Sequence, residues 1–376
     1  MSPRGSGAPS VKAPGSVLVV VTRRIGDVLL ATPLIRSIKA AWSQTKIDAL
    51  VFAGTEGMLE ANPDLRRVLT IAERPRLLTH ARFIAGLAFR YDIALSCLAG
   101  DRPTLYASIA GRWRAGLIEP GNGARWKSWL LSRSIAFDNL DTHTVAMDLA
   151  FAELLGIAPR HEVVVNWSAA DAALVVALVG AGGHKAPYAV LHVHPKFNYK
   201  MWHVEGWIGL AQWLAGRGLT PVLTGAGDPV EIEFVSAIAR RMPDGTINLA
   251  GQLSLAQTAS LIAGARLFVG PDTATTHIAA ALGVPTIALY GPSNPVKWGP
   301  WPEGFAGAPS PWRRAGTQTV GNVRLVQGPG ACVPCRNEGC DRHITSFSDC
   351  LQQLPLDTVI AAAGRALAVA LSERSG

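Results

Sequence analysis

The sequence of 376 residues has no uninterrupted apolar run of about 18 residues, the length that a membrane-spanning helix needs. Charged residues make up only 16% and hydrophobic residues 49%, which argues against a disordered or fibrous protein. Five cysteines are too few, and odd in number, for a secreted disulfide scaffold. Residues 1–16 lack the apolar core of a secretory signal. We therefore expect a cytoplasmic protein.

Acidic residues are fewer than basic ones, 27 against 35, and the formal net charge is +8. The excess favours anionic partners, which could be phosphates, nucleic acid or an acidic membrane surface. The charge is scattered and no recognition motif accompanies it, so no nucleic-acid partner is expected. Between residues 111 and 134, however, five basic side chains alternate with three tryptophans. This segment suits an anionic amphiphile at a membrane, or stacked bases, or a solvated helix face with its tryptophans in the core.

Short apolar runs alternate with amphipathic stretches, which predicts an α/β protein built of βαβ units with parallel strands. In the first half the predicted strands are residues 17–21, 47–52 and 92–97, with a helix after the first strand that has Thr32 as its cap. In the second half the predicted strands are 188–193, 220–224, 266–269 and 285–290, and the predicted helices are 204–217, 230–241, 255–263 and 275–282.

Glycine and proline concentrate between residues 156 and 186, which predicts a linker between two α/β domains. The expected organisation is a flexible tail (1–16), an N-terminal domain (17–160), a linker (161–186), a C-terminal domain (187–354) and a terminal helix (355–376). Open α/β sheets bind ligands beyond the carboxyl ends of their strands. The residues that follow each predicted strand are therefore the functional candidates.

Gly26 and Asp27 follow the first predicted strand. Gly26 permits a tight turn beside a ligand. Asp27 either acts as a general base on a hydroxyl group or caps the next helix. Both alternatives are open at the level of the local sequence.

Lys196 and Lys200 follow the strand predicted at 188–193. They suit a phosphate, and the alternative is a pair of solvated surface lysines. His192 and His194 alternate along the same strand and share one face. They lack an evident third metal ligand.

The strongest local signal is VGPDTATTH, residues 269–277, where a strand ends and a helix begins. A helix N-terminus presents free N–H groups and suits a phosphate. Asp272 either holds a sugar hydroxyl or caps the helix. The hydroxyls of Thr273, Thr275 and Thr276, followed by His277, exceed what one cap requires. This stretch therefore predicts a ligand-binding turn.

Asp228 and Glu231 lie after the strand predicted at 220–224. They fit a nucleotide ribose or base, or a helix N-terminus with favourable charges.

Cys332, Cys335, Cys340 and Cys350 are clustered near the C-terminus. Their spacing is compatible with structural metal, with cross-links or with plain thiols.

Three motifs together resemble glycosyltransferase family 9, the heptosyltransferase-type enzymes. They are RIGDVLLATP (24–33), VGPDT…HIAAALGVP (269–285) and LYGPSNP with WGP (289–300). The resemblance covers about residues 17–371. It implies a GT-B fold, in which two Rossmann-like domains face each other across a cleft. It also implies inverting, metal-independent transfer of heptose from ADP-heptose to the lipopolysaccharide inner core, with no cofactor.

The same resemblance implies roles for individual residues. Asp27 becomes the general base, and Lys200 neutralises the leaving diphosphate. Asp272 binds a donor hydroxyl, Thr273 and the following amides hold phosphate, and His277 supports the turn. An acceptor of this kind implies peripheral contact with the inner face of the inner membrane.

The chain departs from the family pattern at two places. Members often read Asp-Thr-Gly-Pro-Met-His where this chain has DTATTH (272–277), and His-Pro-Gly where it has His192-Val193-His194. Asp228 and Glu231 are further candidates for the nucleoside. The alternatives to ADP-heptose are another nucleotide sugar on the same fold, or a non-catalytic nucleotide-sugar-binding protein.

Overall fold

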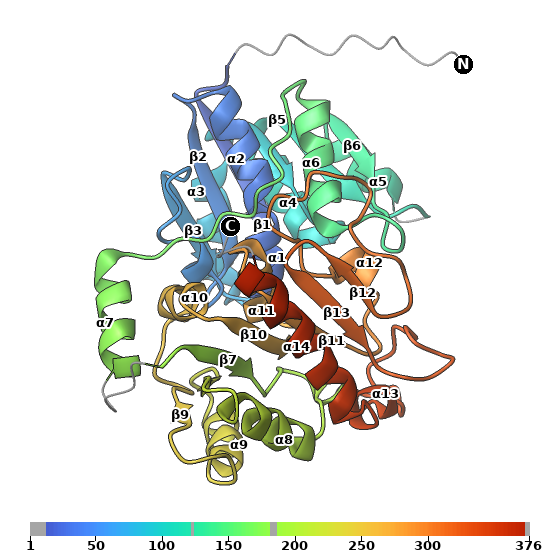
Figure 1. Cartoon of the computed structure of the whole chain (residues 1–376). Helices are drawn as coiled ribbons and strands as arrows, with labels where there is room; N and C mark the ends of the chain where they lie inside the picture. The colour runs from blue at the N-terminus through green and yellow to red at the C-terminus, as the bar shows by residue number, and fades with distance from the viewer. Residues whose placement is uncertain (1–12, 122–123, 181–185, 373–376) are drawn as a thin grey trace. The chain divides into compact units, whose positions relative to one another are not determined.

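The chain divides after Val164 into two α/β units, Met1–Val164 and Val165–Gly376, each with its own sheet. The computed structural model describes residues 13–121, 124–180 and 186–372 (Figure 1). Most of the predicted tail, residues 1–12, lies outside this described part.

The first unit contains a six-stranded sheet in the order β3-β2-β1-β4-β5-β6, and all its strand pairs are parallel. Its strands are β1 (Ser16–Val21), β2 (Lys46–Phe52), β3 (Arg67–Ile71), β4 (Tyr91–Ser96), β5 (Gly111–Ile118) and β6 (Arg133–Ala136). Its helices are α1 (Ile25–Leu30), α2 (Thr32–Ala41), η1 (Glu56–Met58), α3 (Leu77–Leu87), α4 (Asp101–Ala110), α5 (Ala124–Leu130) and α6 (Thr144–Leu154).

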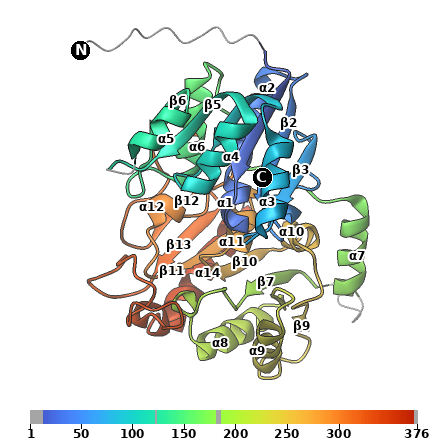
Figure 2. The ribbon, with the colours of Figure 1, turned by 180° about the vertical axis from the view of Figure 1, so that it is seen from behind.

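Strand β1 is apolar at nearly every position because both of its faces are covered. Val17 and Val19 belong to the core layer that α1, α2 and α6 complete. Leu18 and Val20 point to the opposite layer, which α3 and α4 complete. Seen from behind, α3, α4 and α5 lie in a row on that second face (Figure 2).

The second unit contains a seven-stranded sheet in the order β12-β13-β11-β10-β7-β8-β9, in which only the β12–β13 pair is antiparallel. Its strands are β7 (Tyr188–His192), β8 (Thr220–Thr224), β9 (Ile247–Asn248), β10 (Leu267–Pro271), β11 (Thr286–Tyr290), β12 (Gln318–Val320) and β13 (Val323–Gln327). Its helices are α7 (Ala169–Gly180), η2 (Asn198–Lys200), α8 (Val204–Ala215), α9 (Pro229–Ala239), α10 (Leu255–Ala263), α11 (Ala274–Ala281), α12 (Pro295–Trp298), α13 (Asp349–Gln352) and α14 (Leu356–Ser372).

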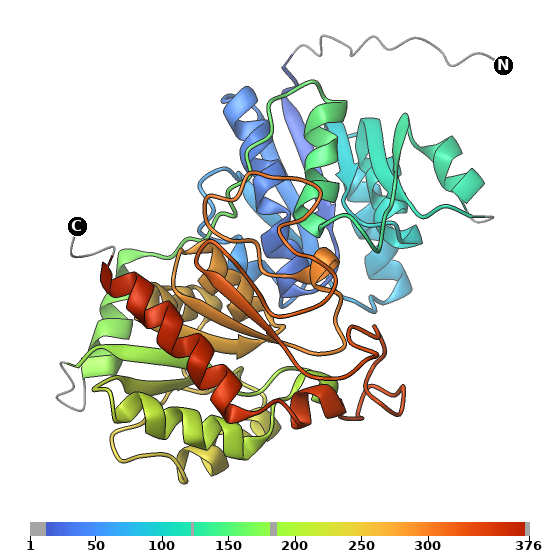
Figure 3. The ribbon, with the colours of Figure 1, turned by 45° about the vertical axis from the view of Figure 1, so that its right-hand side comes forward.

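Helix α14, predicted as a terminal helix, is part of the core of the second unit. Val359, Ala362 and Ala363 are fully or almost fully buried in the same cluster as Leu191 of β7 and Val269 of β10. Figure 3 shows α14 running along the sheet of this unit. Within the described residues, none of the helices is both long enough and apolar enough to cross a bilayer.

Two local expectations differ from the structure. Thr32 is the first residue of α2 and not its cap, and its hydroxyl donates to the Leu29 carbonyl and accepts the Val164 amide. The predicted linker contains α7, a helix that Asp171 joins to α10 through Gln257. Gly180, one of the glycines that suggested a linker, is the last residue of this helix, and the Ala, Leu and Val residues before it permit a helix.

A buried carboxylate connects neighbouring strands of the first sheet through hydrogen bonds. Asp48 of β2 is fully buried and accepts hydrogen bonds from Arg66, Arg67 and Tyr91 at 2.6–2.8 Å. Burial alone would raise the pKa of Asp48, but the donors outweigh it and hold the pKa below its usual 3.8. The network therefore links β2, β3 and β4 through one charged group.

We expect Asp48→Asn to lower the free energy of unfolding by about 1–3 kcal/mol at pH 7, because charge-assisted hydrogen bonds are lost. A carboxylate with a lowered folded pKa stabilises above its unfolded pKa, and this contribution disappears as the pH falls through the folded value. The difference between wild type and Asp48→Asn should thus shrink below pH 3.8. Urea unfolding at several pH values, with exposed Asp244→Asn as control, measures it. A difference that stays constant with pH would contradict the expectation.

Candidate active site

Three neighbouring parallel strands of the second unit end beside one another and bring polar side chains together. Lys200 follows β7, Asp272 follows β10, and Tyr290 closes β11. Lys200 Nζ donates to Asp272 Oδ2 at 2.5 Å, and Ser293 Oγ donates to the same oxygen at 2.6 Å. The Tyr290 hydroxyl can donate its single hydrogen to Asp272 Oδ1 at 3.2 Å or to the Trp298 carbonyl at 2.7 Å. Asp272 is thus the centre of a strand-end cluster, which we call the Asp272 cluster.

Electrostatics keep Asp272 charged although it is buried. Burial raises its pKa, but the charge of Lys200 and the hydrogen bonds from Lys200 and Ser293 lower it below the usual value. Burial, together with the neighbouring carboxylate, raises the pKa of Tyr290 well above its usual value, so its hydroxyl stays a donor. The Asp272 carboxylate is therefore occupied by donors of its own unit, and it fixes the Lys200 ammonium at the strand ends.

The predicted threonine turn is a closed hydrogen-bonded unit at the start of α11. Thr273 is the N-cap residue, and its side chain makes no cap hydrogen bond. Its hydroxyl lies 2.9 Å from the Thr275 hydroxyl and 3.4 Å from that of Thr276. Thr276 is buried and donates to the Pro271 carbonyl at 2.5 Å. Thr275 is also buried, so only Thr273 of the three is partly open to solvent.

His277 lies inside the same helix turn as a neutral ring. It is buried, and burial lowers its pKa to about 4, although Asp272 opposes the shift. Its Nδ1 atom is buried without a hydrogen-bond partner among the described residues. The positive charge of this cluster at neutral pH therefore comes from Lys200 and not from the imidazole.

A second polar cluster lies at the ends of β7 and β8. Glu231 Oε1 accepts the Ala226 amide at 2.7 Å, and its Oε2 lies 3.7 Å from His194 Nδ1. His192 Nδ1 lies 3.1 Å from the Thr224 hydroxyl, and burial lowers the pKa of His192 to about 4. Burial raises the pKa of Glu231, but His194 and the Ala226 amide outweigh it. Glu231 therefore fixes the loop after β8 from within.

Asp228 is the N-cap of α9. Its side chain accepts from the backbone amides of Val230 and Glu231 at 2.9 and 3.3 Å. This is the capping alternative that the sequence left open.

Asp27 and Gly26 lie in the first unit, in the first turn of α1 just after β1. The N-cap of α1 is Arg24, so Asp27 does not cap the helix. Its side chain is buried, and Oδ1 lies 3.6 Å from Arg23 Nη1. Asp27 thus lies in the first turn of a helix, where an acidic side chain interacts favourably with the helix dipole.

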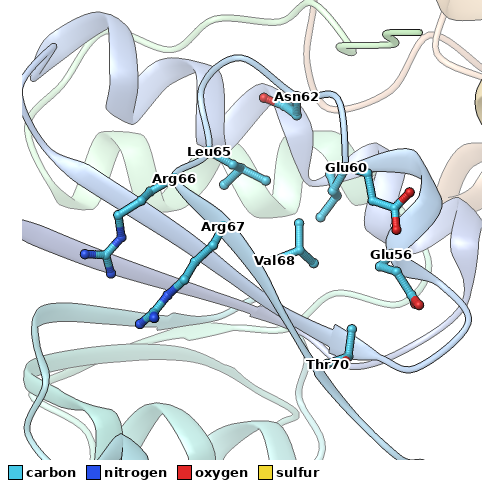
Figure 4. A pocket seen from close by; sticks show the side chains of 9 residues that line it. Glu56, Glu60, Asn62, Leu65, Arg66, Arg67, Val68 and Thr70 are labelled. Carbon is cyan, nitrogen blue, oxygen red and sulfur yellow. The ribbon is translucent and has the colours of Figure 1, made fainter. Parts of the chain in front are cut away.

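A pocket of about 350 Å³ lies beside β3 in the first unit (Figure 4). Arg66 and Arg67, which bind Asp48, stand on one side of it, and Glu56 and Glu60 on the other. None of the residues predicted for the site lines this pocket.

The four C-terminal cysteines are free thiols, of which only Cys350 is buried. Burial, and the charges of the other three thiols, raise the pKa of Cys350 to about 11. In the described part of the chain, no group of three or more His, Cys, Asp or Glu side chains is arranged to hold a metal ion. His192 and His194 are therefore not part of such a group either.

Comparison with known proteins decides the family. The model of glycosyltransferase family 9 (heptosyltransferase) matches residues 104–307, more than half of the chain. The chain belongs to glycosyltransferase family 9. It is therefore a glycosyltransferase, as the sequence motifs predicted.

Individual relatives agree with this assignment. The chain is 28% identical over 294 residues to lipopolysaccharide heptosyltransferase 3 of Escherichia coli K12, with 74% of this chain and 83% of the relative covered. Two solved structures have the same fold. A family 9 glycosyltransferase from Veillonella parvula gives a TM-score of 0.74 at 18% identity, covering 94% and 97% of the two chains. ADP-heptose lipopolysaccharide heptosyltransferase II of E. coli gives 0.73 at 19%, covering 96% and 99%. The predicted GT-B fold is confirmed.

Tyr290 and Ser293 of this family 9 enzyme were missing from the predicted site. The strand predicted at 285–290 ends at Tyr290, and Ser293 follows in the next turn. This position at a strand end is the sequence signal that could have identified both residues. Their hydrogen bonds to Asp272 depend on β11 lying beside β10, and local sequence does not give that strand order.

The neutral state of His277 can be measured. Because burial lowers its pKa to about 4, its ring resonances should stay constant between pH 8 and pH 5.5 and shift only near pH 4. Proton–nitrogen NMR of the imidazoles measures this, and His277→Gln assigns the signal. A midpoint near 6.5 would show that the ring gains a proton near neutral pH, contrary to expectation.

Proposed function

We propose that this chain is a heptosyltransferase that moves heptose from ADP-heptose to the inner core of lipopolysaccharide, with inversion and without a divalent metal. The observation that carries the proposal is the Lys200–Asp272 pair, 2.5 Å apart at the N-terminus of α11. The names of the relatives support the donor and the acceptor: lipopolysaccharide heptosyltransferase 3 and ADP-heptose lipopolysaccharide heptosyltransferase II, both of E. coli.

The donor diphosphate is assigned to Lys200, Thr273 and the first amides of α11. An ammonium and a helix N-terminus are preorganised positive groups, which stabilise charge as it develops on the leaving ADP. Asp272 keeps the ammonium in place and is assigned to a donor hydroxyl. Thr275, Thr276 and His277 support the turn from inside. The nucleoside is assigned to the loop at residues 225–228, which Glu231 fixes and where Asp228 is exposed.

Asp27 is assigned as the general base, and Gly26 lies beside it in α1. The acceptor hydroxyl gives its proton to an Asp27 oxygen while its own oxygen bonds to the anomeric carbon. The bond from that carbon to the β-phosphate oxygen breaks, and ADP leaves with the electron pair. Direct displacement of this kind inverts the anomeric centre. Lys200 supplies the charge that a metal ion would otherwise supply, so transfer in the presence of EDTA should continue.

The acceptor is proposed to be an anionic glycolipid at the cytoplasmic face of the inner membrane, with the enzyme in peripheral contact with that membrane. The net charge of +8 supports an anionic acceptor.

A second candidate is the same reaction with another nucleotide sugar. The departure from the family pattern at residues 272–277 favours testing it, because Thr275 and Thr276 fill the interior of the proposed phosphate turn. The non-catalytic alternative is disfavoured by the retention of Asp27 and of the Lys200–Asp272 pair.

Lys200→Ala should weaken ADP-heptose and ADP binding by about tenfold or more, because a charge-assisted contact to phosphate is lost. Calorimetric titration measures this, with UDP-sugars and GDP-sugars as competing donors. The matched control is Lys196→Ala, an exposed lysine of the same loop, which should bind normally. Tighter binding of a UDP- or GDP-sugar would favour the second candidate. Absence of any nucleotide-sugar binding would refute both.

Asp27→Asn should keep donor affinity and lose about 10²–10⁴-fold in transfer, because only the proton acceptor is removed. Mass spectrometry of the acceptor product measures turnover, and NMR of its anomeric proton measures inversion. Asp244→Asn, at an exposed residue to which no role in the reaction is assigned, serves as the control and should keep full activity. Full turnover by Asp27→Asn would exclude Asp27 as the base.

A further inference from the structure

Helix α5 of the first unit exposes two large indoles. Trp129 is 84% exposed and Trp126 is 40% exposed. They lie at positions i and i+3 of the helix and so share one side of it. Arg125 is exposed next to them. The structure thus rejects the alternative in which both tryptophans of this helix are buried in the core.

Lys127 attaches α5 to the rest of the unit, and its Nζ also lies over the Trp126 ring, 5.7 Å from the ring centroid. Its Nζ donates to the Ala99 carbonyl at 2.7 Å and lies 2.7 Å from Asp101 Oδ1, at the start of α4. This anchor fixes which side of α5 faces outward. The exposed indoles are therefore a property of the folded unit and not of a frayed helix. Figure 3 shows α5 at the β6 edge of the first unit.

A second exposed apolar site lies on the same face of the sheet. Leu77 and Leu78, the first residues of α3, are 87% and 77% exposed. Helix α3 contacts α4, and α4 contacts α5, so both sites flank α4 (Figure 2). Exposed Arg74 and Arg76 precede the two leucines.

The two sequence segments that carry these sites are rich in basic residues, although Lys127 is paired with the exposed Asp101. Residues 111–134 contain five basic side chains and one acidic residue, Glu119. Residues 72–90 contain four arginines and one acidic residue, Glu73. Indoles and basic side chains together are the composition that settles in the headgroup layer of an anionic bilayer.

We infer that α5, with the start of α3, forms a docking face for an anionic lipid bilayer, in which Trp126, Trp129, Leu77 and Leu78 enter the headgroup region. The inference rests on the proposed function for its partner and names the surface that would meet the membrane. Charge complementarity favours a bilayer over a protein partner. The two apolar sites lie on separate helices and do not form the one continuous apolar patch that is typical of a protein interface.

Vesicle co-sedimentation tests the docking face with the whole protein. Wild type should bind vesicles of phosphatidylethanolamine and phosphatidylglycerol at 3:1, and bind phosphatidylcholine vesicles at least tenfold more weakly. W126S/W129S and L77S/L78S should each weaken binding to the anionic vesicles at least tenfold. The matched control is V176S/V230S, which removes two equally exposed apolar side chains of the second unit, 73% and 74% exposed, and should bind as wild type does.

Several outcomes would overturn the inference. One is that W126S/W129S binds anionic vesicles as tightly as wild type does. Another is that the control V176S/V230S loses as much vesicle binding as W126S/W129S does. Binding of single-stranded DNA by wild type, lost in W126S/W129S and without vesicle binding, would assign the tryptophans to base stacking. Circular dichroism melting verifies that the variants fold.

Turnover on a short, detergent-free soluble acceptor separates this inference from the proposed function. The docking variants should keep that turnover while losing vesicle binding. Vesicle binding without heptose transfer by wild type would refute the proposed function and leave the docking face standing. Heptose transfer by wild type without vesicle binding would refute the docking face and leave the proposed function standing.

Discussion

The Asp272 carboxylate is the group on which the order of the second unit's strand ends depends. It accepts from Lys200, Ser293 and Tyr290, which come from segments after or at the end of neighbouring strands. A buried carboxylate without such donors would lose its charge or destabilise the fold. The Lys200–Asp272 contact therefore does two things: it keeps Asp272 charged, and it holds the ammonium that we propose binds the donor diphosphate.

Much of the fold was predictable because parallel strands buried on both faces are short and continuously apolar. The strand at 220–224 and the helix at 255–263 have their predicted bounds. Less apolar elements were missed. Strand β3 begins with Arg67, and β5 begins with glycine and carries two arginines, so neither reads as a buried strand. Helix α7 was missed because the sequence becomes rich in glycine from Gly180, its last residue, onward.

The candidate site was predictable only as a set of strand-end turns. Sequence indicated that Asp272, Thr273 and Lys200 follow strands, and the parallel order of β7, β10 and β11 brings those ends together. The sequence did not indicate which polar side-chain atoms already have hydrogen-bond partners inside the protein. Thr276 and Glu231 illustrate this, because their oxygens bond to nearby backbone groups, and such pairing depends on three-dimensional packing.

Helix α14 has a consequence for the order in which the chain folds during synthesis. The first unit is complete at Val164 and makes its core from residues before that point. The core of the second unit needs Val359, Ala362 and Ala363, which are translated near the end of the chain. The first unit can therefore fold while the ribosome is still synthesising the second unit. The second keeps an open apolar surface until α14 emerges, and this interval is when a nascent chain most needs protection from aggregation.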